Sequence, residues 1–107
     1  MAIRTTFGSL EALNLMAGRL LADIATLRSY GAPPLAQLEA SPHLNHWSYS
    51  TRPVSCLEGF ATDHPVLGSF VSVRTSDIMM IDETAGWVRT FSRFYTLGER
   101  VPLSPPS

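Results

Sequence analysis

Apolar residues recur every three or four positions along the first third of the chain, the spacing of one face of an α-helix. They are Leu10, Leu13, Met16, Leu20, Ile24 and Leu27. Ser9 suits the N-cap, and Gly31 suits the left-handed position that follows a helix end. Pro33 and Pro34 prevent the helix from continuing. The pattern predicts an amphipathic helix over residues 9–30.

Beyond this helix the hydrophobic pattern changes twice. Pro34 suits a first helical turn and predicts a second, short helix over residues 34–40. Extended runs rich in β-branched and aromatic residues follow at 47–50, 54–61 and 69–75. Turns separate these runs at Arg52–Pro53 and at Asp63–His64–Pro65, where the proline disfavours a helical His64.

The last third has the pattern of a β-hairpin. Ile78–Ile81 is an apolar strand, Asp82–Gly86 carries turn residues, and Trp87–Leu97 returns as a strand. Alternation along a strand places every second residue on one face. On this strand that face carries Trp87, Arg89, Phe91, Arg93 and Tyr95. The proline-rich tail at 99–107 is expected to be mobile.

Together these elements predict an α+β fold in a single domain, residues 1–107. The amphipathic N-terminal helix is expected to pack on a small antiparallel sheet of about four to five strands over residues 47–97. A chain of 107 residues is long enough for one modest hydrophobic core.

Composition narrows the functional classes. The net charge is −1, which disfavours a dedicated nucleic-acid binder, and all eight basic residues are Arg. The absence of Lys excludes Schiff-base and P-loop lysine chemistry. One cysteine excludes an intramolecular disulfide. No leader pattern and no run of about 20 apolar residues is present, so a soluble cytoplasmic protein of bacterial or phage origin is expected, without membrane association.

The soft and imidazole ligands of the chain are His43, His46, Cys56 and His64. Their types suit zinc, but their spacing is not that of a zinc finger, so this set is an alternative to ordinary turn and surface histidines. A Cys–His nucleophile would pair Cys56 with His43 or His64 and use Asp63 for orientation, but no local signature accompanies it. We therefore expect no catalytic residue, no metal and no cofactor.

The alternating face of Trp87, Arg89, Phe91, Arg93 and Tyr95 leaves three interpretations open. In the first interpretation, its aromatic side chains join the core while the guanidinium groups reach water. Alternatively, the face is a protein interface, because these residue types dominate binding hot spots. In the third interpretation it stacks the bases of single-stranded nucleic acid.

Several short motifs in the second half of the chain form a recognisable series. They are His64-Pro65, Leu67-Gly68, Thr75-Ser76, Ile81-Asp82, the run from Gly86 to Thr90, and Ser92-Arg93-x-Tyr95-x-Leu97-Gly98. With Cys56-Leu57, Gly59 and a tryptophan near Trp47, the series resembles a proteobacterial family of unknown function, DUF6634, over residues 44–98. The resemblance implies no activity, cofactor or partner. Val66 stands where a basic residue is expected, which argues against anion binding at that turn.

These observations favour a non-enzymatic protein–protein interaction module that occupies a surface of a larger bacterial protein or complex. A phage- or mobile-element-encoded inhibitor, such as an anti-CRISPR protein, is one form of this hypothesis. The alternative function is nucleic-acid binding on the Arg and aromatic strand face. A monomer or a homodimer is compatible with the wide apolar stripe of the helix.

Overall fold

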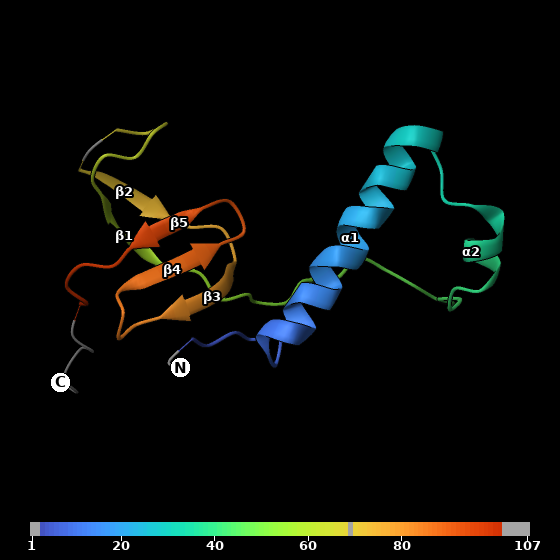
Figure 1. Ribbon diagram of the computed structural model, residues 1–107, viewed down its shortest axis with the longest axis horizontal. Coiled ribbons are helices and arrows are strands. Elements are labelled where there is room, and N and C mark those ends of the chain that lie inside the picture. Colours follow the sequence, from blue (N-terminus) through green and yellow to red (C-terminus); the bar gives the residue numbers. More distant parts are fainter. Residues whose placement is uncertain (1–2, 69, 102–107) are drawn as a thin grey trace. The chain divides into compact units, whose positions relative to one another are not determined.

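The computed structural model describes residues 3–68 and 70–101, which form two compact units (Figure 1). One unit, residues 10–53, contains two helices, and the other, residues 3–9 and 54–101, contains five strands. The predicted α+β class is confirmed. The strands form two antiparallel sheets, of two and three strands. The packing of helix on sheet and the single-domain organisation stay predictions.

The two helices lie where the sequence pattern places them. Helix α1 spans Leu10–Tyr30, and Gly31 follows it at φ 74° with its amide donating to Leu27 O at 2.8 Å. This is the left-handed ending expected of a glycine. Helix α2 spans Leu35–Glu39, with Pro34 as its N-cap. Within the described residues, neither helix is long and apolar enough to cross a membrane.

The strand unit contains two antiparallel sheets. Strands β1 (Glu58–Ala61) and β2 (Val71–Arg74) pair with each other, in the register Glu58 opposite Arg74. Strands β3 (Ile78–Asp82), β4 (Trp87–Thr90) and β5 (Phe94–Thr96) form the second sheet in the order β3-β4-β5. The run 47–50, predicted as a strand, contains none; there Trp47 and Tyr49 pack edge to face at 5.7 Å.

The predicted turn between β3 and β4 is confirmed. The Asp82 carboxylate, 8% exposed, accepts a hydrogen bond from the Ala85 amide at 2.9 Å. Gly86 has φ 82°, and its amide donates to Asp82 O at 2.9 Å. An aspartate that binds a backbone amide of its own turn, followed by a residue with positive φ, is typical of such connections.

The predicted single strand over Trp87–Leu97 is wrong: the chain reverses within it. Thr90 is fully buried, and its Oγ1 donates to Arg93 O at 3.1 Å and accepts from Arg93 N at 3.3 Å. The Thr90 amide also donates to Arg93 O, at 2.8 Å. These bonds fold residues 91–93 into a tight turn, so that β4 and β5 become an antiparallel hairpin.

The core of the strand unit centres on β4. Val88 and Thr90 are fully buried. Val88 lies opposite Ile81 of β3 and Tyr95 of β5, and directly opposed residues in antiparallel strands share a face. The buried face of the three-stranded sheet therefore contains Val88 and its two neighbours. The residues that alternate with Val88 along β4 lie on the opposite face.

Candidate functional site

The opposite face of this sheet carries the residues that suit a binding surface best. The β4–β5 register places Trp87 opposite Thr96 and Arg89 opposite Phe94. Trp87, Arg89 and Phe94 thus share one face, which we name the Arg–aromatic face. It differs from the predicted surface because the hairpin brings in Phe94 from the neighbouring strand.

The three side chains of the Arg–aromatic face form a small cluster. The Trp87 and Phe94 rings meet edge to face, with centroids 5.8 Å apart. The Arg89 Cζ atom lies 5.3 Å from the Phe94 centroid, within the range of a cation–π contact. Phe94 is nevertheless 63% exposed. The cluster therefore exposes the Phe94 ring to solvent, with the Arg89 guanidinium in contact with that ring.

The five residues predicted for this surface are distributed over three places. Trp87 and Arg89 lie together on the Arg–aromatic face. Phe91, 66% exposed, and Arg93, half-buried, belong to the turn between β4 and β5. Tyr95 lies on the other face, opposite Val88. A shared face for all five is therefore wrong, because it required the uninterrupted strand.

Tyr95 contacts the turn that joins β1 and β2. Its hydroxyl lies 3.4 Å from His64 Nε2, and the two rings are 6.1 Å apart. His64 Nδ1 accepts hydrogen bonds from the amides of Val66 and Leu67, both at 3.1 Å. Because Nδ1 is an acceptor, we assign the proton to Nε2, which then donates to the Tyr95 oxygen. His64 thus stabilises a turn and connects it to β5.

Replacing His64 with Ala is expected to lower the free energy of unfolding by about 1 kcal/mol, because two turn amides lose their acceptor in a partly exposed site. His64→Asn is the matched control: its side-chain oxygen accepts from an amide two residues on and restores part of the loss. Thermal unfolding followed by circular dichroism measures both variants. Equal midpoints for wild type and His64→Ala would contradict the structural role of the imidazole.

The four residues of the alternative zinc set are divided between the two units. His43 and His46 belong to the helical unit, whereas Cys56 and His64 belong to the strand unit. Within residues 3–68 and 70–101, no group of three or more His, Cys, Asp or Glu side chains is placed to hold a metal ion. The half-buried Cys56 makes no hydrogen bond to His64, whose ring nitrogens bind the turn amides and Tyr95.

Glu58 and Arg74 form a cross-strand ion pair on the β1–β2 sheet. The Arg74 Nε and Nη2 atoms both donate to Glu58 Oε1, at 2.8 and 2.6 Å. The hydrogen bonds to Glu58 and its negative charge raise the pKa of Arg74, with a smaller contribution from Cys56. Both side chains are largely exposed, so the pair contributes little to stability. Its cation is already neutralised within the sheet.

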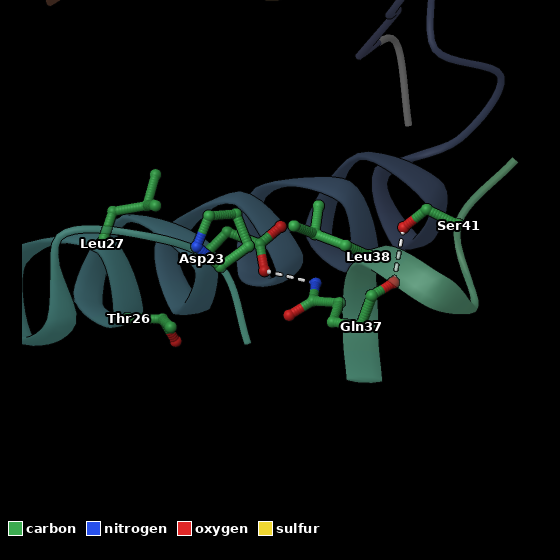
Figure 2. Close-up of a pocket in the computed structure, with 7 residues that line it drawn as sticks. Asp23, Thr26, Leu27, Gln37, Leu38 and Ser41 are labelled. Carbon is green, nitrogen blue, oxygen red and sulfur yellow. Dashed lines mark hydrogen bonds between the residues drawn. The ribbon is translucent and has the colours of Figure 1, made fainter. Parts of the chain in front are cut away.

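A small pocket lies between α1 and α2 in the helical unit (Figure 2). Its lining residues are Asp23, Thr26, Leu27, Pro33, Gln37, Leu38 and Ser41. Gln37 Nε2 donates to Asp23 Oδ1 at 3.4 Å, and Ser41 Oγ donates to Gln37 O at 2.7 Å. The volume of about 240 Å³ is below that of typical ligand sites, and these polar groups bind one another. We assign it no ligand.

The fold and the Arg–aromatic face define a small α+β protein with an exposed, cationic aromatic cluster on a three-stranded sheet. The chain belongs to the family of unknown function DUF6634, whose model matches residues 16–103. The resemblance drawn from its motifs is confirmed. Searches of curated proteins and of solved structures find no match.

Proposed function

We propose that the protein is a non-enzymatic interaction module that binds a partner protein through the Arg–aromatic face. The observation that carries the proposal is the exposed Phe94 ring, which holds the Arg89 guanidinium beside Trp87. Tryptophan and arginine are the residue types most enriched in binding hot spots. An inhibitor that occupies a surface of a larger bacterial complex, such as an anti-CRISPR protein, is one form of such a module.

The charge of Arg89 supports the same proposal. Its Nη2 atom makes one long hydrogen bond, 3.5 Å, to the carbonyl of Phe91 in the adjacent turn. No described carboxylate forms an ion pair with it; the three ion pairs among the described residues use Arg4, Arg74 and Arg100. A partner carboxylate at this position gains a charge-assisted hydrogen bond with a pre-positioned guanidinium.

Affinity capture with quantitative mass spectrometry tests this function. Arg89→Glu is expected to reduce recovery of the specific partner about tenfold, because it reverses the charge at the centre of the proposed interface. Arg19→Glu, an equal charge change on the exposed surface of α1, is the control and is expected to leave recovery unchanged. Equal recovery by wild type and Arg89→Glu, with both folded by circular dichroism, would rule this face out as the interface.

Single-stranded nucleic acid is the second candidate ligand, since the exposed Phe94 ring beside a guanidinium offers a stacking platform. Fluorescence anisotropy with labelled oligothymidylate discriminates this candidate. A nucleic-acid module is expected to bind at about 50 mM salt and to weaken steeply towards about 200 mM, as phosphate contacts require. Negligible binding at the lower salt concentration excludes it.

A further inference from the structure

The three-stranded sheet has one covered edge and one open edge. At the β3 edge, the Arg4 and Ile81 backbones exchange two hydrogen bonds, of 2.7 and 2.9 Å, and the Ile78 amide donates to Ser55 O at 2.9 Å. Strand β5 is the opposite edge. No described residue pairs with the outer side of β5. An open edge exposes backbone donors and acceptors that another strand can complete.

The hydrogen-bond pattern shows which backbone groups face outward. The Leu97 amide donates to Gly86 O, and the Thr90 amide donates to Arg93 O, both at 2.8 Å. Hydrogen-bonded and non-hydrogen-bonded pairs alternate along an antiparallel ladder. Phe94 and Thr96 therefore occupy non-hydrogen-bonded positions opposite β4. Their N–H and C=O groups point to the open edge.

The side chains beside this edge are apolar and cationic. Phe94 is 63% exposed, and the guanidinium of Arg89 extends over its ring from the neighbouring strand. Neither Arg89 nor Arg93 has an ion-pair partner among the described residues. On the same face, the Asp82 carboxylate of β3 is buried and accepts a hydrogen bond from the Ala85 amide, and Glu83 in the adjoining turn binds Arg4 and Arg100. The Arg89 guanidinium is therefore available to a partner carboxylate beside β5.

We propose that the partner presents an extended, acidic polypeptide segment that adds to the sheet as a fourth strand beside β5. This inference rests on the proposed function and specifies the chemistry of the partner. The segment's backbone pairs with the outward groups of Phe94 and Thr96, as in other β-strand additions. A carboxylate of the segment reaches the Arg89 guanidinium, which already lies above β5. An apolar side chain of the segment covers Phe94.

The main test uses peptides selected from a random display library on the full chain and then synthesised. Selected peptides are expected to carry Glu or Asp among β-branched or aromatic residues. Thr96→Pro is expected to weaken their binding at least about tenfold by calorimetry, because proline removes the outward N–H while the β4 ladder does not use it. Thr96→Ala keeps the amide and is expected to lose much less affinity than Thr96→Pro.

Amide hydrogen exchange on the wild-type chain provides a second measurement that does not depend on how the proline variant folds. The selected peptide is expected to slow exchange of the Phe94 and Thr96 amides. Unchanged exchange at both amides, no enriched peptide, or enriched peptides without acidic residues would overturn the proposal. Slowed exchange with rising protein concentration and no peptide would also overturn it, since a second copy would then occupy the edge.

The two proposals fail in different ways. Suppose that Arg89→Glu abolishes capture of the partner while the Thr96→Pro variant binds the selected peptides as wild type does. The Arg–aromatic face is then the interface, but strand addition is wrong. If Arg89→Glu has no effect on capture or on peptide binding, both the interface and the strand addition are wrong. If oligothymidylate binds at these residues and no peptide does, the face is assigned to nucleic acid. The proposal of an acidic polypeptide segment is then wrong.

Discussion

Val88→Asp is expected to destabilise the strand unit by about 4 kcal/mol, which is enough to unfold most small domains. Val88 is fully buried at the centre of β4, opposite Ile81 and Tyr95. A carboxylate at this position loses its hydration between the apolar side chains of Ile81 and Tyr95. The cost is that of an uncompensated buried charge, which is larger than that of a lost methyl group.

Chemical denaturation provides the measurement, followed by tryptophan fluorescence in a Trp47→Phe background so that Trp87 of β4 alone reports. Val101→Asp introduces the same charge at a position that is 83% exposed, and we expect less than about 0.5 kcal/mol there. Val88→Thr, with the shape of valine and one hydroxyl, should cost about 1–3 kcal/mol. A Val88→Asp midpoint close to that of Val101→Asp would contradict the placement of the core on β4.

Local sequence signals were sufficient for those elements that depend on neighbouring residues. Helix α1 follows from the spacing of its apolar residues and from Gly31, whose positive φ ends it. The β3–β4 turn follows from Asp82 and Gly86, which act within five consecutive residues. In both cases the determining interactions lie a few positions apart in the chain, so a pattern of residue types contains them.

The β4–β5 turn was missed because its stabilising contacts are partly remote in sequence. Residues 90–93 contain no Gly, Pro or Asn, and the apolar alternation runs through them without interruption. Ser92 contacts Ser76, sixteen positions earlier in the chain. The two hydroxyl oxygens lie 2.8 Å apart, and the Ser92 amide donates a hydrogen bond to Ser76 Oγ at 3.2 Å. Short-range turn chemistry does not reveal such a contact. The hydroxyl-rich run Thr90-Phe91-Ser92 was the available signal.

The β4–β5 turn also explains why the predicted surface differs from the Arg–aromatic face. An uninterrupted strand places Tyr95 on the same face as Arg89, whereas the hairpin places Phe94 on that face and turns Tyr95 toward His64. Trp87 and Arg89 were identified correctly as members of one face because they precede the turn. The composition of a strand face therefore depends on a single reversal, and the residue that closes this reversal is Thr90.

Thr90→Val is expected to lower the free energy of unfolding by about 2 kcal/mol, because the Arg93 amide loses its hydroxyl acceptor in a partly buried turn. Valine keeps the volume of threonine, so the change isolates the hydroxyl. Thr90→Ser is the complementary variant: it keeps Oγ, removes one buried methyl group, and should cost about 1 kcal/mol.

Urea unfolding and the near-ultraviolet circular dichroism of Trp87 measure the two variants together. If the hydroxyl of Thr90 closes the hairpin, the valine variant loses both stability and the Trp87–Phe94 edge contact of 5.8 Å, whereas the serine variant keeps the aromatic signal. The opposite order of stability would show that packing of the Thr90 methyl group, and not its two bonds to Arg93, positions β5. Because Phe94 enters the Arg–aromatic face through this hairpin, loss of the turn should also weaken any ligand that binds there.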